Sequence, residues 1–461
     1  MTSHTSVLNR ESFLSSKRIE KLTLGLAFGV ALCVPVKLSL TYAFLLPLIL
    51  LWSYENFDNR AFVFQQVRAW ALPFLAFVLM SMVTGLFGLH PLGSAFHLFR
   101  LGFNFLVAIV FFRLAEERYF LLLTAALLFG QFIGSLHTVL ESAFPGHIPV
   151  IFHGAVSESG QLAITSIFAF GLFLQTLERS ESRAARAALV QVMTTSLAVG
   201  IFASSHWLRL PLWLQFFALG ALLVHLSSNM FRVVSLYNNL ERPRAMLVFL
   251  ASLVLPLLFA ALIVNLKRGP WAGVTAGMLI LLFCHARRFL VPFLGVVCLL
   301  AVFLEPVASR IVQMPAHFFM SGGRGTIWDI GLELALRFPL GIGFDNSGVL
   351  RQFSPEVPSV LNHFHSNFLN ILVETGWPGF ALYLWWLVSI VVFALFRHRV
   401  SPLTTSVLAV IVSWQVAGLA EYNFGDSEVL LTLLVVLGIS LRGLQPSSAQ
   451  AKFSTMAASH D

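Results

Sequence analysis

Residues 245–266, AMLVFLASLVLPLLFAALIVNL, contain no charged side chain and lie between Arg244 on one side and Lys267-Arg268 on the other. An α-helix crosses the hydrocarbon core of a bilayer with about 20 apolar residues. In lipid, a single segment can satisfy all its own backbone hydrogen bonds only as a helix. The stretch therefore predicts a transmembrane helix.

The rest of the chain has the same character. Of its 461 residues, 57% are hydrophobic and 11% are charged, and the mean hydropathy is +0.83. Soluble domains carry about 25% charged residues because their surface faces water. The composition therefore excludes an ordinary soluble enzyme and predicts that most of the surface faces lipid.

Fourteen apolar runs are long enough to be considered as crossings. They are residues 21–36, 38–54, 69–89, 95–114, 119–140, 160–177, 188–205, 211–229, 245–266, 271–284, 289–305, 377–396, 403–420 and 428–441. The first two and 271–284 are short, so twelve or thirteen crossings remain open. We predict an all-α, polytopic integral membrane bundle of about 12–14 helices.

The basic residues predict the orientation of this bundle. With the N-terminus in the cytoplasm, twenty of the 29 Lys and Arg residues fall in cytoplasmic segments. Cytoplasmic loops are enriched in these residues. We therefore expect both termini in the cytoplasm, with an N-terminal segment 1–20, a membrane domain 21–441 and a disordered tail 442–461.

Two connections on the predicted extracytoplasmic side are long. Residues 141–159 contain no Lys or Arg, and residues 306–376 are long enough to form their own substructure. Long loops are often functional. Within the second loop, 326–338 reads as an amphipathic helix with Thr326 as its cap. Residues 366–375 read as another helix, closed by Gly376 before the next crossing.

Charge and cysteine usage argue against several further classes of protein. The net charge of +8 comes from arginines in short loops, which favours a membrane orientation signal over a nucleic-acid surface. The three cysteines, Cys33, Cys284 and Cys298, lie in apolar runs and form neither a disulfide framework nor a zinc motif. No Gly-x-x-x-x-Gly-Lys nucleotide loop occurs, so we expect no nucleotide and no cofactor.

Two cationic features lie on the predicted extracytoplasmic side. Lys267-Arg268 precedes Gly269-Pro270-Trp271, and Arg324 follows two glycines directly before the amphipathic helix. An arginine at the membrane surface binds an anion or extends to the lipid headgroups. A glycine-rich turn at a helix N-terminus favours phosphate, although ordinary loop-to-helix turns look the same.

A third feature is the pair His363 and His365 at the start of the 366–375 helix. Such a pair serves as general bases, as metal ligands or as an interfacial polar cluster. Their spacing does not suit a helical metal pair, and no carboxylate is close in sequence, so we expect no metal. A helix N-terminus keeps a nearby imidazole neutral, as a base for a sugar hydroxyl must be.

These residues carry a resemblance to a known family. His365-Ser366, nine further residues and Gly376-Trp377-Pro378-Gly379 resemble the histidine motif of the O-antigen ligase and polymerase superfamily. Arg268-Gly269-Pro270-Trp271 resembles its Arg-Gly-x-Trp motif. Arg324 to Trp328, leading to Pro339 to Gly343, resembles its arginine helix and the turn that follows, and the loop 421–424 is also similar.

The resemblance implies a metal-independent membrane glycosyltransferase in a bacterial inner membrane, which uses an undecaprenyl-diphosphate-linked glycan at the periplasmic face. Arg268 and Arg324 are then expected to hold the diphosphate, and His365 to take the proton from the acceptor. Arg209 is either a third phosphate-binding arginine or a structural residue. His363 is a candidate supporting residue, and Glu158 and Gln161 are candidates for acceptor contacts.

The shared motifs do not specify the molecule that accepts the glycan. A ligase transfers the glycan to lipid A core, a polymerase transfers it to another carrier-linked repeat, and related enzymes transfer it to protein. We expect a ligase, with a polymerase as the alternative within the family. The competing class is a transporter of the same lipid-linked glycan, which would place charged residues near the bilayer midplane.

Overall fold

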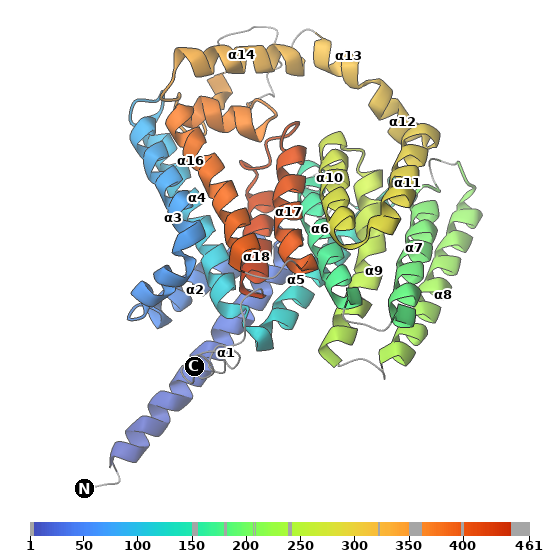
Figure 1. Ribbon diagram of the computed structural model, residues 1–461, viewed down its shortest axis with the longest axis horizontal. Coiled ribbons are helices and arrows are strands. Elements are labelled where there is room, and N and C mark those ends of the chain that lie inside the picture. Colours follow the sequence, from blue (N-terminus) through green and yellow to red (C-terminus); the bar gives the residue numbers. More distant parts are fainter. Residues whose placement is uncertain are drawn as a thin grey trace, which may run out of the picture.

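The computed structural model describes residues 4–149, 155–178, 182–205, 207, 209–237, 242–320, 323–349, 362–397 and 401–443. Within these ranges the chain is helical and contains no strand, and its long helices stand side by side in one bundle (Figure 1). The prediction of an all-α, polytopic helical membrane protein is therefore confirmed.

The helices of the bundle are α1 (His4–Cys33), α2 (Leu38–Glu55), α3 (Arg60–Gly85), α4 (Pro91–Leu114), α5 (Glu117–Ala143), α6 (Ala155–Glu178), α7 (Ser182–Ala203), α8 (Leu212–Tyr237), α9 (Arg242–Val264), α10 (Arg268–His285), α11 (Leu290–Phe303), α16 (Asn367–Arg397), α17 (Pro402–Ala417) and α18 (Ser427–Gly443). Shorter elements are η1 (Arg287–Phe289), α12 (Glu305–Val312), α13 (Met314–Phe319), α14 (Arg324–Arg337) and η2 (Ser347–Val349).

Each of the fourteen predicted apolar runs coincides with one long helix. By length and hydropathy alone, six helices of the described residues could cross a membrane, namely α2 to α6 and α16. A seventh is added if α11 and α12 count as one broken span. The other runs form shorter or less apolar helices that pack in the same bundle. In addition, α1 begins at His4, so most of the polar segment 1–20 continues the first apolar run as helix.

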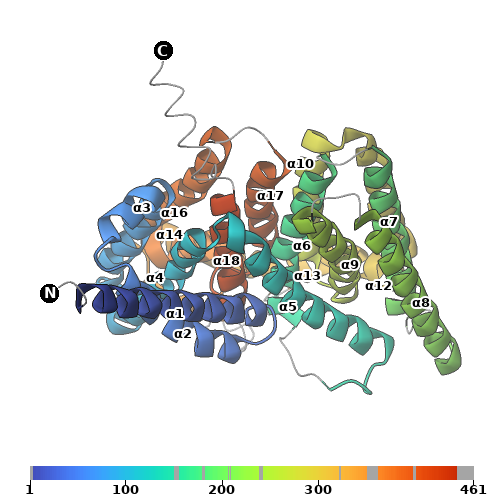
Figure 2. The same ribbon diagram turned by 90° about the horizontal axis from the view of Figure 1, so that it is seen from below.

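The centre of the bundle is α18. Every residue from Val429 to Leu441 is buried, which is expected of a helix that is apolar on all sides and enclosed by other helices. α18 packs against α4, α6 and α17, while α7 and α8 lie at one edge and α3 at the other (Figures 1 and 2). Gly438 permits a close approach to α4, because a Cβ there would meet the carbonyl oxygen of Ala108 at 2.6 Å.

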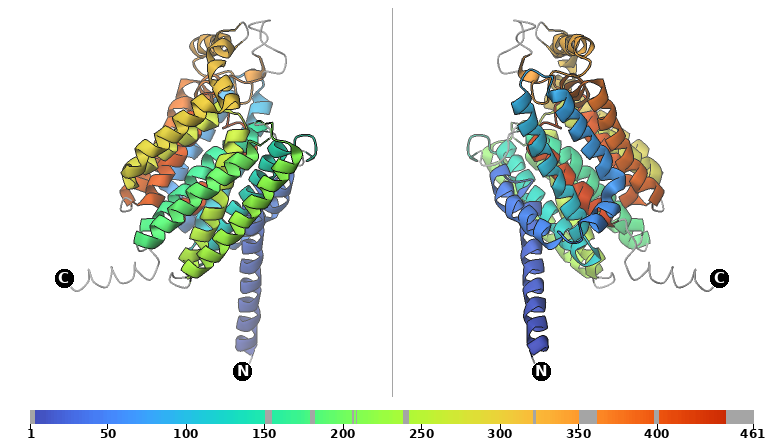
Figure 3. Two further views of the ribbon diagram at one scale, coloured as in Figure 1. Left: turned by 90° about the vertical axis from the view of Figure 1, so that its right-hand side faces the viewer. Right: turned by 90° about the vertical axis from the view of Figure 1, so that its left-hand side faces the viewer.

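The predicted periplasmic connections meet at one end of the bundle. The Leu89 N–H donates to the carbonyl of Ile342 at 2.8 Å, and the Ser157 hydroxyl donates to Asp426 at 2.6 Å. The start of α1 projects beyond the opposite end, away from α12, α13 and α14 (Figure 3). These two contacts hold the connections of this end against one another.

The long connection between α11 and α16 forms an arch over this end of the bundle (Figure 1). α11 has no buried residue, and the chain bends by 82° between α11 and α12. α14 begins at Arg324 and not, as predicted, after a Thr326 cap. Gly323 has extended backbone and occupies the cap position, so Arg324 is the first helical residue.

α16 is broken where the sequence predicted the end of one helix and the start of the next. Gly376 has φ 68° and ψ −178°, a conformation that glycine alone adopts readily. At the break, the Trp377 N–H donates to the carbonyl of Pro339 at 3.0 Å. The break thus docks the turn after α14 onto α16 and fixes the segment that carries His365.

Gly376→Ala is expected to destabilise the protein. An alanine Cβ would lie against the backbone of Pro339 and Leu340, and this backbone conformation costs a further ~1–3 kcal/mol for a residue other than glycine. We expect a clearly lower midpoint of thermal unfolding in detergent, measured by intrinsic fluorescence. Gly348→Ala is the matched control, because no atom lies within 4 Å of a Cβ at that position. Equal midpoints for the two variants would contradict this role of the break.

Candidate functional site

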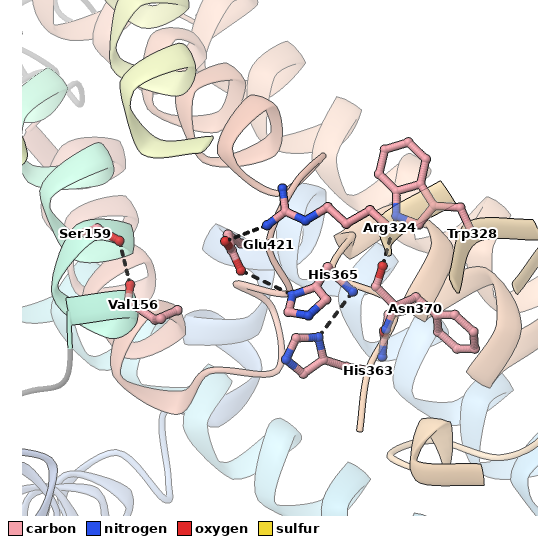
Figure 4. Close-up of polar contacts among 9 residues, drawn as sticks. Val156, Ser159, Arg324, Trp328, His363, His365, Asn370 and Glu421 are labelled. Atoms are coloured by element: carbon pink, nitrogen blue, oxygen red, sulfur yellow. Dashed lines mark hydrogen bonds and ion pairs between the residues drawn. The ribbon is translucent and has the colours of Figure 1, made fainter. Parts of the chain in front are cut away.

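The polar site lies under the arch, where three segments distant in sequence converge. Arg324 comes from the first turn of α14, His363 and His365 come from the segment before α16, and Glu421 comes from the connection between α17 and α18. Their side chains are directed toward one another (Figure 4). The structure therefore brings together Arg324 and both histidines, as the sequence predicted.

Glu421 connects the cation to the histidine. One carboxylate oxygen accepts from Arg324 Nη2 at 3.0 Å, and the other lies 3.4 Å from His365 Nδ1. The side chains are 15% exposed for Glu421, 20% for His365 and 28% for Arg324. The group is thus partly withdrawn from water while it stays accessible to a substrate.

The charge state of Glu421 follows from its neighbours. Burial raises the pKa of its carboxyl, but the hydrogen bond to His365 and the charges of Arg324, His365 and Lys267 lower it, so that the pKa lies below its ordinary value. An ionised carboxylate at this distance favours the proton of His365 on Nδ1. The Nε2 atom is then left with a free lone pair, which is what a general base needs.

His363 supports the backbone of His365. The N–H of His365 donates to His363 Nδ1 at 3.2 Å, and the two rings meet edge-on with centroids 4.3 Å apart. His365 has φ 49°, which is uncommon for a residue other than glycine. Unusual backbone held in this way is typical of functional sites.

The residue after His365 explains part of the motif. Ser366 precedes α16, and its hydroxyl accepts from the N–H of Leu369 at 3.4 Å, as an N-cap side chain does. The Asn367 N–H donates to the carbonyl of Gly418, three residues before Glu421. A capped helix start and this backbone contact together hold His365 beside the Glu421 segment.

Arg268 extends the positive charge of the site. It is the first residue of α10, and its Nη1 donates to the carbonyl of Arg310 in α12 at 3.0 Å. Burial lowers the pKa of its guanidinium, and the charges of Arg324 and Arg310 lower it further. The negative charge of Glu421 opposes this shift, so Arg268 is near enough to both arginines and to Glu421 for an added anion to be stabilised.

The other predicted residues lie in different places. Glu158 is buried and accepts hydrogen bonds from Thr138 and from Asn265, at 3.2 Å for the latter, so it joins α5, α6 and the end of α9. Gln161 is fully buried and donates to the backbone carbonyls of Val34 and Glu428. Gln161 thus has a packing position and not an accessible one.

Arg209 lies between α7 and α8, is exposed and has φ 52°. Within the described part of the chain, it makes no direct hydrogen bond or ion pair with Glu421 or His365. Its role as a third phosphate-binding arginine stays a prediction.

Glu421 is the functional residue that the sequence did not single out. It is 56 residues from His365 in the chain, so no local spacing could pair the two. The available signal was its position directly before Tyr422-Asn423-Phe424, in a connection already noted as similar to the superfamily. No cluster of three or more His, Cys, Asp and Glu side chains suited to a metal occurs in the described part of the chain.

The stability of the His363 segment should depend on pH. Burial, and then the charge of His365, lower the pKa of His363 to about 4 from 6.5. When the segment opens, His363 binds a proton more readily, so falling pH favours opening from about 6.5 down to about 4. We expect amide hydrogen exchange in residues 362–370 to speed up over this range, after correction for intrinsic rates.

His363→Asn provides the control. The amide oxygen of asparagine can accept the His365 N–H in place of Nδ1, but it does not titrate. This variant should show a smaller acid-induced loss of protection than the parent protein. The same loss in both proteins would mean that another group controls the segment.

Fold and site define a polytopic helical membrane protein with an arginine–glutamate–histidine cluster at one end of its bundle. Residues 251–384 match the family model described as O-antigen ligase. The match confirms the resemblance to the O-antigen ligase and polymerase superfamily. It covers Arg268, Arg324 and both histidines but ends before Glu421. None of the curated proteins compared with the chain matches it.

Proposed function

We propose that this protein is an inverting glycosyltransferase that moves a glycan from undecaprenyl diphosphate to an acceptor at the periplasmic face of the inner membrane. The observation that carries the proposal is the contact of Glu421 with both Arg324 and His365. It joins a diphosphate-binding cation to a general base in one site. The family match supports the class of reaction.

The arginines would bind the donor. Arg324 and Arg268 lie in the first turns of two helices, the charge of Glu421 acts on Arg268, and Lys267 is close enough to lower the pKa of Glu421. Guanidinium groups bind phosphate oxygens through paired, charge-assisted hydrogen bonds. The two arginines would hold the diphosphate and stabilise the negative charge that grows on it as it leaves.

His365 would activate the acceptor. Its Nε2 takes the proton of an acceptor hydroxyl while the hydroxyl oxygen forms a bond to the anomeric carbon. The bond from that carbon to the diphosphate oxygen breaks, and the lipid diphosphate leaves with the electron pair. Attack from the face opposite the leaving group inverts the anomeric configuration. Glu421 orients the imidazole and stabilises the imidazolium that forms, as the carboxylate of a catalytic triad does.

The placement of charge favours an enzyme over a transporter. In the described residues, the only buried ionisable carboxylates are Glu158 and Glu374. Glu158 is in the first turn of α6, and Glu374 lies two residues before the break in α16. Both are near the end of the bundle that carries the site, whereas a transporter concentrates charge near the midplane.

Among acceptors we favour lipid A core, so that the enzyme is an O-antigen ligase; a polymerase acting on a second carrier-linked repeat is the alternative. The test is deletion of the gene in its host and electrophoresis of the extracted lipopolysaccharide. A core without attached chains, with long chains still on the carrier, supports the ligase. A core bearing a single repeat supports the polymerase. An unchanged ladder contradicts both.

A further inference from the structure

Glu374 lies at the centre of the polar network beneath the site. It belongs to the first part of α16 and is fully buried. Its Oε1 accepts from Asn370 Nδ2 at 3.0 Å, and its Oε2 accepts from the Tyr422 hydroxyl at 3.3 Å. Neither the catalytic steps above nor the histidine motif uses this carboxyl group.

The Asn370 branch leads to the two histidines. Asn370 Oδ1 accepts the N–H of Phe364, the residue between His363 and His365, at 2.7 Å. The carbonyl of Phe364 in turn accepts from Trp328 Nε1 at 3.0 Å (Figure 4). Because Trp328 is one turn along α14 from Arg324, this branch fixes both the base and the helix that presents the arginine.

The Tyr422 branch leads to the carboxylate partner. Tyr422 directly follows Glu421, and its ring lies 5.8 Å from that of His363 between centroids. The hydrogen bond from the Tyr422 hydroxyl to Glu374 therefore fixes the position of the connection that carries Glu421. Each member of the Glu421–His365 pair is one residue away from a residue in this hydrogen-bonded network.

The donors around position 374 suit a side chain with two oxygen atoms that accept hydrogen bonds. Asn370 is committed in orientation, because its oxygen accepts from Phe364 and its amide group must therefore donate. Ser347 also belongs to the network. Its hydroxyl accepts from Asn370 Nδ2 at 3.3 Å and donates to the carbonyl of Asn362 at 2.9 Å. A buried polar side chain is costly unless hydrogen-bonded, so the network holds only when its members are all in place.

We infer that Glu374 is a positioning residue for the glycosyl transfer proposed above: it holds His365 and Glu421 in register through Asn370 and Tyr422 without touching the substrate. The inference rests on that proposed function. A displacement of the base by about 1 Å lowers the rate roughly 100-fold, since the geometry of attack is lost while the diphosphate contacts remain.

The experiment compares purified Glu374→Ala, Glu374→Gln and the parent protein in proteoliposomes. The probe is a synthetic lipid-diphosphate-linked sugar, with an acceptor chosen from the deletion experiment. For Glu374→Ala we expect kcat to fall about 100-fold and KM for the donor to change much less. Residues 362–370 should also lose protection from hydrogen exchange.

Glu374→Gln should recover most of the rate. Its oxygen can accept from Asn370, and the Tyr422 hydroxyl can rotate to accept from its amide group. Tyr422→Phe removes only the hydroxyl of the second branch, so it should fall between the parent and Glu374→Ala and tests the inference even if Glu374→Ala does not fold. Glu333→Ala, an exposed glutamate of α14, is the matched control and should behave as the parent does.

Unchanged kcat in Glu374→Ala would overturn the inference, as would a Gln variant no better than the Ala variant. The hydrogen-exchange measurement separates this failure from failure of the proposed function. If the parent protein transfers no sugar, the proposed function is wrong. Exchange in residues 362–370 still reports whether Glu374 holds the segment, and unchanged exchange in Glu374→Ala would overturn that role too.

Discussion

His365→Ala is expected to abolish glycan transfer almost completely while the donor still binds. A positioned general base contributes about 10²–10⁴-fold to the rate, and no other imidazole in the site has the same contact with a carboxylate. His363 uses its Nδ1 to accept from the His365 backbone and belongs to a different hydrogen bond. It is therefore not placed to substitute for the missing base.

The measurement is the transfer rate of purified protein in proteoliposomes, with donor binding measured separately by competition. His363→Asn is the matched control, because it changes the neighbouring ring and keeps the hydrogen bond to the His365 backbone. We expect that control to retain more than about a tenth of the parent rate, since a weakened neutral hydrogen bond costs about 1 kcal/mol. Full activity in His365→Ala at equal expression would refute the proposed mechanism.

The sequence predicted the fold because the physical constraint on a membrane helix is local. A run such as 245–266 has to become helical in lipid whatever its neighbours are, so each predicted run coincides with a helix. The break at Gly376 was predictable for the same reason, since glycine and proline act on the backbone where they stand. The 82° bend after α11 was not, because Pro306 marks where the apolar run ends but does not set the direction that α12 takes.

The site was only partly predictable because its contacts are long-range. Arg324 and His365 belong to motifs whose spacing can be read along the chain. Glu421 and Glu374 act through partners that folding brings to them, 56 residues away for His365 and 48 for Tyr422. Gln161 illustrates the converse, since its place near a loop suggested acceptor contact, whereas the fold buries it against backbone carbonyls.

Exchange of the charges of Arg324 and Glu421 distinguishes a diphosphate-binding arginine from an arginine that only stabilises the fold. In a structural ion pair, Arg324→Glu combined with Glu421→Arg restores the attraction, and the double variant recovers. In the proposed site it cannot recover, because the carboxylate at position 324 would face the donor diphosphate and the base would lose its carboxylate. We expect both single variants and the double variant to lose transfer by at least about 100-fold.

Neutral substitutions of Arg324 and of Glu421 should also change different kinetic quantities. Arg324→Met removes charge-assisted hydrogen bonds worth about 1.5–3 kcal/mol, so donor affinity should fall roughly 10-fold to 100-fold. Glu421→Gln keeps an acceptor for His365 Nδ1 but removes the charge, so kcat should fall while donor affinity stays the same or improves. Donor affinity should not fall because, in the parent protein, the Glu421 carboxylate occupies one N–H group of Arg324 and competes with the donor diphosphate for it. Recovery of the double variant, or weaker donor binding in Glu421→Gln, would assign the pair to stability instead of catalysis.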